Sequence, residues 1–306
     1  MATSKPATRR RARLVRGPLT VGEPAAPVDA QLAISDPYRP DTIADGGDGF
    51  GLTVRAASVR GLFKRYVGGP RQDDVCLRAH PETQTLIVAV ADGVSAAGRS
   101  DLGAALAVRH ASAAIARQLD AAGELDGDGA ELDWREVFDH AGWALVEEHR
   151  RHSGDPTAGA EEAASSLATT LVVAAITALE DGAWRAQVAA VGDSPALSLA
   201  DAEFEVIVGE AGSSDGLLGG GVAALPRHTR AVCSDARTFG AGTVLIVCTD
   251  GLALPLGDGN GEVGRMLIRE LATPPEIVDF ARLLDFSRST YDDDRTLVAV
   301  WPRVPA

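Results

Sequence analysis

Short apolar runs that end at Asp, Gly or Pro indicate where the buried strands of this chain lie. Leu86–Ala91 (LIVAVA) runs into Asp-Gly, and Thr243–Cys248 (TVLIVC) runs into Thr-Asp-Gly. A continuous apolar run followed by turn residues is typical of a strand that is buried on both faces. The same pattern predicts four more strands, with a turn near Gly182, over Leu167–Leu179, Ala186–Val191, Pro195–Leu199 and Arg295–Trp301.

Apolar residues at helical spacing predict helices between these strands. The two long ones cover Asp101–Leu119 and Asp133–His152, with Asp133 as the N-cap of the second. Two shorter ones cover Glu262–Leu271 and Pro275–Ser287. Because strands come in adjacent pairs and helices in pairs between them, the order favours an α+β fold of antiparallel sheets flanked by helices.

The first 48 residues differ in composition from the rest of the chain. Residues 1–48 are rich in Pro, Ala, Arg, Asp and Gly and have no sustained apolar period, so we expect a disordered leader there. We expect one folded domain over residues 49–306. Within it, the Gly- and Ser-rich residues 209–224 predict a surface loop.

Charge and composition narrow the class of protein. The formal net charge is −14, although residues 1–16 hold six basic side chains and no acidic one. The chain after residue 16 is therefore strongly acidic, which disfavours nucleic-acid binding and favours the binding of cations. No apolar stretch is long enough to cross a bilayer, no apolar h-region follows the basic start, and the three cysteines are scattered. We therefore expect a cytoplasmic protein.

Four aspartates share one sequence context. Asp92, Asp193 and Asp250 lie just beyond an apolar strand and next to glycine, and Asp293 lies just before one. A single Asp-Gly is more often a turn, so the argument depends on the four together. Because the ends of strands from one core converge, carboxylates at those ends can meet in space. Carboxylates packed together repel one another and raise one another's pKa. A divalent cation relieves that repulsion, and oxygen ligands select magnesium, manganese or calcium over zinc.

Other candidate sites have a plainer interpretation. Gly212–Gly216 matches the Gly-x-Ser-x-Gly nucleophile motif, but a glycine-rich stretch follows it where a helix is required. His149 and His152 are three residues apart on a predicted helix, where a solvated helix end is favoured over a metal site. Three hydroxyls that could bind phosphate are expected instead to form local hydrogen bonds: Ser166, Thr169 and Thr170.

Six segments, taken in order, resemble the protein phosphatase 2C family of metal-dependent protein phosphatases, and its divergent bacterial branch in particular. The resemblance covers roughly Ala57–Pro302. The segments are GLFKRYVGGPRQDD (61–74), VAVADGVSAAGRSDLGA (88–104), SLATTLVVA (166–174), VGDSPALSL (191–199), VCTDGLALPL (247–256) and DDDRTLVAV (292–300). The resemblance implies an αββα sandwich of two antiparallel sheets and a serine/threonine protein phosphatase that uses metal ions.

The family pattern also implies a ligand set. Asp92 would bridge two metals and the Gly93 carbonyl would bind the first, while Asp250 and Asp293 would hold the second. Asp193 would serve a third ion. The cofactors would be two or three Mn2+ or Mg2+ ions, and a water activated by them would attack phosphorus without a covalent phosphoenzyme.

The first motif leaves alternatives open. The family's early acidic pair corresponds to Gln72-Asp73, in which Asp73 would orient the attacking water, or to Asp73-Asp74 if the register moves by one residue. Lys64 lies where the divergent branch often has a basic residue and would bind the phosphate. The other basic residues that compete for this role are Arg65 and Arg71.

Two further departures concern the metal motifs. Asp92 and Gly93 are followed by Val-Ser-Ala where the family has x-Gly-Gly, and position 94 carries no histidine that could act as a general acid. Asp293-Asp294 replaces the usual Asp-Asn, which adds negative charge beside the metals.

These observations predict the partners and the rival functions. We expect a monomer that acts on phosphorylated proteins, in a signalling role, with a Ser/Thr kinase or the targets of one as partners. One rival is a regulator that has lost catalysis, suggested by the altered first motif. Another is an enzyme with the same chemistry that acts on a small phosphoester.

Overall fold

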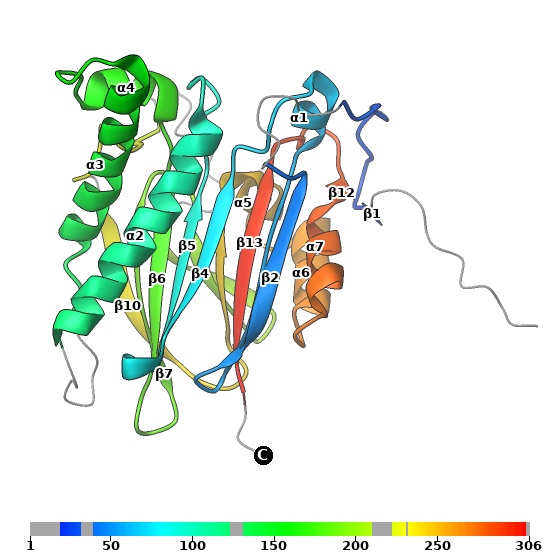
Figure 1. Cartoon of the computed structure of the whole chain (residues 1–306). Helices are drawn as coiled ribbons and strands as arrows, with labels where there is room; N and C mark the ends of the chain where they lie inside the picture. The colour runs from blue at the N-terminus through cyan, green and yellow to red at the C-terminus, as the bar shows by residue number, and fades with distance from the viewer. Residues whose placement is uncertain (1–18, 32–38, 123–130, 210–221, 231, 304–306) are drawn as a thin grey trace, which may run out of the picture.

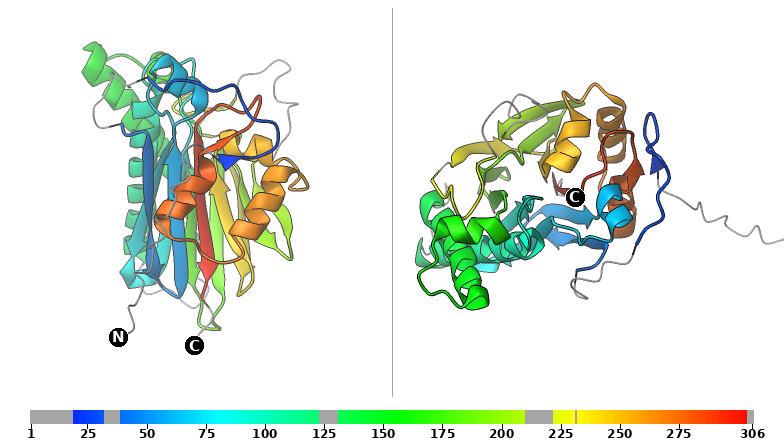
Figure 2. Two further views of the ribbon diagram at one scale, coloured as in Figure 1. Left: turned by 90° about the vertical axis from the view of Figure 1, so that its right-hand side faces the viewer. Right: turned by 90° about the horizontal axis from the view of Figure 1, so that it is seen from above.

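Two antiparallel β-sheets lie face to face in this chain, and helices cover the outer face of each (Figures 1 and 2). The computed structural model describes residues 19–31, 39–122, 131–209, 222–230 and 232–303. This is the αββα arrangement expected from the sequence.

The five-stranded sheet has the order β10-β7-β6-β5-β4 and is antiparallel throughout. Its strands are β4 Asp74–His80, β5 Thr85–Ala91, β6 Leu171–Ala178, β7 Trp184–Val191 and β10 Cys233–Phe239. A 3-10 turn, η1 Pro81–Thr83, joins β4 to β5.

The six-stranded sheet has the order β2-β3-β13-β11-β8-β9, also antiparallel. Its strands are β2 Thr42–Gly49, β3 Leu52–Val59, β8 Ala196–Ala200, β9 Glu203–Val208, β11 Val244–Cys248 and β13 Arg295–Pro302. A separate parallel pair is formed by β1 Leu19–Thr20 and β12 Phe286–Ser287.

The helices divide between the two outer faces. The five-stranded sheet is covered by α2 Ser100–Ala122 and α3 Trp134–Ser153, and α4 Ala160–Leu167 lies next to them. The six-stranded sheet is covered by α5 Asp250–Leu256, α6 Glu262–Glu270 and α7 Ile277–Leu284. The short helix α1 Leu62–Val67 lies at the end of the sandwich that is uppermost in Figure 1.

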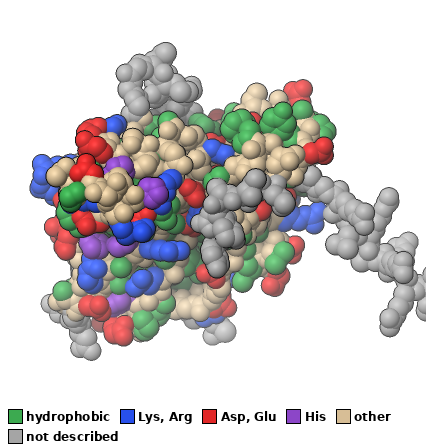
Figure 3. Space-filling view, turned by 45° about the horizontal axis from the view of Figure 1, so that its top comes forward, with side chains coloured by type: hydrophobic (Ala, Val, Ile, Leu, Met, Phe, Trp, Pro, Cys, Tyr) green, Lys and Arg blue, Asp and Glu red, His purple; other side chains and the backbone are tan. Residues whose placement is uncertain are grey.

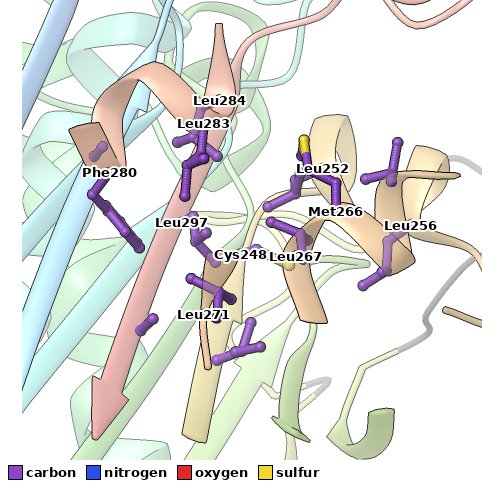
Figure 4. Packing of buried hydrophobic residues seen from close by; sticks show 14 of the residues in the cluster. Cys248, Leu252, Leu256, Met266, Leu267, Leu271, Phe280, Leu283, Leu284 and Leu297 are labelled. Carbon is purple, nitrogen blue, oxygen red and sulfur yellow. The ribbon is translucent and has the colours of Figure 1, made fainter. Parts of the chain in front are cut away.

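Strands in the middle of each sheet are buried on both faces, and this explains their continuous apolar runs. Along β5, Ile87 and Ala89 pack towards α2 and α3, whereas Val88 and Val90 pack into the layer between the sheets. A third apolar layer lies between the six-stranded sheet and its helices. There Phe280 and Leu284 of α7 and Leu267 of α6 approach Leu297 of β13 (Figure 4).

The predicted helices agree with the structure apart from their ends. The Asp133 carboxylate accepts from the Glu136 N–H at 3.1 Å, as an N-cap does. The predicted strand Leu167–Leu179 is wrong at its start, because α4 extends to Leu167. The predicted helix Pro275–Ser287 ends at Leu284, since Phe286–Ser287 pairs with β1 instead.

Regular secondary structure is present before the predicted domain boundary at residue 48. Within the predicted leader 1–48, Thr42–Gly49 pairs with β3 along its whole length and Leu19–Thr20 pairs with β12. Residues 1–18 and 32–38 lie outside the described residues, as do residues 210–221 of the predicted loop 209–224. The sequence TIADGGDG gave no strand signal because β2 is an edge strand whose side chains are mostly exposed.

Candidate metal centre

Four carboxylates from the two sheets meet at the end of the sandwich near α1. Asp73 immediately precedes β4 and Asp92 follows β5, while Asp250 follows β11 and Asp293 lies shortly before β13. Burial, and then the charges of Asp73, Asp250 and Asp293, raise the pKa of Asp92 well above its usual range. Asp92 and Asp250 also share a side-chain hydrogen bond. Three of the four aspartates that the strand-end context predicted to converge, Asp92, Asp250 and Asp293, are in this group. Its fourth member, Asp73, comes from the first motif rather than from that context.

Asp73 is the acidic residue of the first motif that faces this group. Its Oδ2 accepts from Thr249 Oγ1 at 2.8 Å and from Thr296 Oγ1 at 2.7 Å. Burial raises the pKa of Asp73, and the charge of Asp294 raises it further. Asp74 instead pairs with Arg39 at 2.8 Å. The geometry thus favours the Gln72-Asp73 register.

The backbone of Asp92 is held by two threonines at the start of β6. The Asp92 carbonyl accepts from Thr170 N at 2.8 Å and from Thr169 Oγ1 at 2.7 Å, and Asp92 N donates to Thr170 Oγ1 at 3.3 Å. These hydroxyls make the local hydrogen bonds that were expected of them. A Cβ on Gly93 would lie 2.7 Å from the Ser100 carbonyl oxygen, so only glycine fits here.

Asp250 is the first residue of α5, and the glycine after it also allows a close backbone approach. A Cβ on Gly251 would lie 1.9 Å from the Asp294 carbonyl oxygen. Neither Gly93 nor Gly251 has a positive φ angle. A tight turn therefore does not explain these two Asp-Gly pairs, which bring the ends of separate segments into contact.

Asp294, where the family usually has asparagine, ties three segments together. It is buried, and its two carboxylate oxygens accept from Gly61 N at 2.7 Å and from Gln72 N at 2.6 Å. Burial raises the pKa of Asp294, although these two N–H groups act in the opposite direction. The pKa of Asp293 is also raised, first by burial and then by Asp250.

Lys64 is the candidate basic residue whose charge acts on Asp293 and Asp294. It is buried, its Nζ donates to Gln72 Oε1 and, at 3.2 Å, to Ser95 Oγ, and its charge opposes the rise in the pKa of Asp293. The two alternatives are engaged elsewhere. Arg65 pairs with Asp41 at 2.8 Å and with Asp285 at 2.6 Å, and Arg71 donates to Ser58 Oγ at 2.7 Å and to the Asp73 carbonyl at 2.6 Å.

Asp193 lies in the link between β7 and β8, close to the backbone of Asp92. Its neighbour Ser194 shares a hydrogen bond of 3.1 Å with Thr170, which in turn holds Asp92. Asp193 is therefore next in the chain to a residue that is linked to Asp92 through Thr170.

The donor chemistry fits hard divalent cations. The available ligands are carboxylate and carbonyl oxygens, and burial followed by the charge of Asp250 raises the pKa of the nearby Cys248 thiol to about 12, so it offers no thiolate. Within the described ranges, no group of three or more His, Cys, Asp or Glu side chains is set in ligand geometry. Asp92 and Asp250 are close enough for one divalent cation to take the place of the hydrogen bond between them.

The remaining sequence candidates lie outside this centre. His149 Nδ1 bonds to Ser166 Oγ at 2.9 Å, and His152 is exposed in the last turn of α3. Gly212–Gly216 falls outside the described residues. Sequence reasoning missed Thr249 and Thr296, which position Asp73, and it noted the charge of Asp294 without its role in holding the first motif. Thr249 precedes a predicted ligand and Thr296 lies near the start of a strand, and each is a weak signal by itself.

A family model for protein phosphatase 2C matches residues 60–295. The chain belongs to the protein phosphatase 2C family. The match spans every candidate ligand from Asp73 to Asp293. No curated protein sequence matches the chain.

Solved structures with the same fold share little sequence with this protein phosphatase 2C chain. A bacterial serine phosphatase has a TM-score of 0.59 at 13% identity, covering 83% of this chain and 98% of that one. The catalytic domain of the serine threonine protein phosphatase PstP, in complex with 2 manganese ions, has a TM-score of 0.51 at 21% identity, covering 83% and 99%. RsbX in complex with magnesium has a TM-score of 0.51 at 12% identity, covering 85% and 99%. At these identities the likeness shows the fold.

Proposed function

We propose that this chain is a metal-dependent protein phosphatase that hydrolyses phosphoserine or phosphothreonine. The observation that carries the proposal is the meeting of Asp73, Asp92, Asp250 and Asp293, two from each sheet, beside the buried Lys64. Carboxylates brought together in this way repel one another, at a cost that is greater where one is buried, as Asp73 is, unless cations neutralise them. Membership of the family and neighbours solved with manganese or magnesium support the same reading.

In this proposal the carboxylates hold two Mn2+ or Mg2+ ions. Asp92 and the Gly93 carbonyl serve the first ion, Asp92, Asp250 and Asp293 serve the second, and Asp193 borders a place for a third. Bound divalent cations lower the pKa of water and stabilise negative charge on a phosphoryl group.

The chain's own residues position the reactants. Lys64 Nζ, held by Gln72 and Ser95, is placed to attract the phosphoryl oxygens of the substrate. The Thr249 and Thr296 hydroxyls fix one oxygen of Asp73, which leaves its other oxygen to accept a hydrogen bond from water and so orient it.

Hydrolysis of p-nitrophenyl phosphate and of a phosphothreonine peptide, with and without Mn2+, tests this function. We expect turnover only with the cation, and we expect it to be lost in Asp92→Ala and Asp250→Ala variants that remain folded. Wild-type turnover at the same rate in the presence of a chelator would contradict the proposal.

A regulator without catalysis is the rival function, and one observation favours it: in the part of the chain that is described, no ready-made group of three ligands exists. Calorimetric titration with Mn2+ separates the two. Binding in the micromolar to millimolar range, with release of protons as carboxylates are deprotonated, supports the enzyme. No heat of binding at millimolar Mn2+ supports the regulator.

The cellular setting is part of the proposal. The scattered cysteines favour a cytoplasmic protein. Membership of the family suggests phosphoproteins made by Ser/Thr kinases as substrates, and we expect a monomer. Among the described helices, none has the length and apolar character needed to span a bilayer. Figure 3 shows Lys, Arg and His side chains mixed with Asp and Glu side chains on the side of the molecule where α2 to α4 lie.

A further inference from the structure

Helix α1 presents three large hydrophobic side chains to solvent. Phe63 is 51% exposed, Tyr66 62% and Val67 53%. Because residues three and four apart share one face of a helix, these three form a single apolar surface, which we call the α1 stripe. Isolated exposed hydrophobics are ordinary, but three together on a helix of six residues mark a contact surface.

The α1 stripe is continuous with the candidate metal centre. Lys64 Nζ lies 5.8 Å from the centroid of the Phe63 ring. Phe63 N donates to the Asp292 carbonyl at 3.0 Å, which places Phe63 next to the segment that carries Asp293. At the other end, a methyl on Gly69 would touch both Val67 and the Lys64 stem, at 3.6 and 3.7 Å.

Helix α1 is held firmly, so the α1 stripe has a fixed position. On the opposite side of the helix, Arg65 is paired with Asp41 and Asp285, and its carbonyl accepts from Gln31 N at 2.8 Å. The helix ends at Gly68 in the left-handed conformation. A fixed apolar surface binds with a smaller loss of entropy than a mobile one.

We propose that the α1 stripe is a docking surface for apolar residues that flank the phosphorylated residue of a protein substrate. The inference rests on the proposed function and names its substrate class. A peptide in extended conformation advances about 3.3 Å per residue, so a phosphate beside Lys64 places the residue one or two positions away over Phe63. The exposed carboxylate of Asp292, which lies next to Phe63, disfavours acidic flanking residues. A small phosphoester would leave the stripe unused.

Two phosphothreonine peptides test this, one with Leu and one with Ser at the two positions on each side of the phosphothreonine, both assayed with Mn2+. For the wild type we expect kcat/KM to be about tenfold higher with the Leu peptide, the size of effect that burying one apolar side chain gives. In a Phe63→Ser/Tyr66→Ser variant the preference should fall towards parity.

Two further variants control for indirect effects. Tyr66→Ser alone leaves the contact between Phe63 and Lys64 intact and should lower the preference in part. Val278→Ser alters a side chain of α7 that is 78% exposed, and it should keep the full preference.

The outcomes separate the two levels of inference. Equal kcat/KM for both peptides with the wild type, or a preference that survives in the double variant, overturns the docking surface while the phosphatase stands. Absence of Mn2+-dependent hydrolysis of both peptides and of p-nitrophenyl phosphate overturns the proposed function itself. A marked fall in Tm of the double variant would show that the chain itself covers the stripe, and loss of a wild-type dimer would show that a second copy covers it; either result overturns the proposal.

Discussion

Asp294 shows how one carboxylate oxygen can decide the geometry of a neighbouring segment. Each of its two oxygens accepts one backbone N–H, from Gly61 and from Gln72, and the side chain is buried. The asparagine usual in the family has only one acceptor oxygen. The acidic residue at this position is therefore explained by the backbone that it holds.

We predict that Asp294→Asn destabilises the fold by about 1–3 kcal/mol, because one buried N–H loses its acceptor and faces an amide NH2 instead. Urea unfolding measured by circular dichroism gives the free energy. The control is Asp292→Asn, an exposed neighbour, which should change it little. An unchanged midpoint for Asp294→Asn would contradict the role assigned to Asp294.

At the candidate ligands the same kind of substitution should act in the opposite direction on stability. Asp92→Asn removes a carboxylate whose pKa is raised by burial and by its acidic neighbours, so the metal-free variant should be at least as stable as the wild type. Its Mn2+-dependent activity should fall by more than about 100-fold. Thermal unfolding and p-nitrophenyl phosphate turnover check the two effects, with Asp139→Asn on α3 as a control that should retain both properties.

At the scale of elements, the segment before β2 braces the first motif. Arg39 Nη2 donates to the Arg71 carbonyl at 3.0 Å and to the Asp73 carbonyl at 3.1 Å, and its Nη1 pairs with Asp74 at 2.8 Å. This region of the chain, predicted to be a disordered leader, therefore contacts the backbone of a candidate catalytic residue.

We predict that Arg39→Ala weakens Mn2+ binding about tenfold, since the residues around metal ligands contribute on that scale. Calorimetry measures the affinity, and Arg39→Lys should recover part of it through the pair with Asp74. The matched control is Arg135→Ala on α3, whose side chain is 62% exposed. Equal affinities for wild type and Arg39→Ala would show that the brace has no effect on the centre.

The close contact between the start of α5 and the segment before β13 requires a residue without a side chain, Gly251. We predict that Gly251→Ala prevents this packing, because its Cβ would sit 1.9 Å from the Asp294 carbonyl oxygen. The variant should lose Mn2+ binding together with stability. Gly98→Ala, at a position with open space around the Cβ, should behave as wild type. The Tm of both proteins and their Mn2+ titrations provide the check.

The elements that could be predicted from sequence were those buried on both faces. β5 and β11 carry continuous apolar runs, and α3 carries its own cap. The missed strands β2, β4, β9 and β10 lie at sheet edges, where exposed side chains break the apolar runs. β3 was missed although it is buried and lies between β2 and β13, because Arg55 and Ser58 interrupt its apolar run. The strand-end context pointed to the candidate ligands Asp92, Asp250 and Asp293, and only the family motif pointed to Asp73. Their supports were not, because hydrogen bonds from Thr249 and Thr296 to Asp73 join positions far apart in sequence.

At the scale of the whole molecule, the clustered carboxylates link stability to pH and to divalent cations. The pKa values of Asp73 and Asp92 are raised above 3.8, mainly by burial and then by the charges of neighbouring carboxylates. The folded protein therefore binds protons more tightly than the unfolded chain, and this contribution to stability is present at low pH and is lost as pH rises from about 3.8 through the raised values.

We predict that Mn2+ raises the Tm more at pH 8 than at pH 5.5, because protons compete with the cation for the same oxygens at the lower pH. Thermal scans of the metal-free and the Mn2+-loaded protein at both pH values measure the two shifts. The Asp92→Asn variant should show a smaller difference between them. A shift that does not depend on pH would argue against binding at these carboxylates.

Because two of the four carboxylates belong to each sheet, a cation held by Asp92 and Asp250 together would also link the two sheets at this end of the sandwich. Movement of one sheet relative to the other would then break that link before it exposed the apolar layer between the sheets. Under the proposed function, metal would be the first thing lost on unfolding, and activity would disappear while most of the secondary structure was still in place.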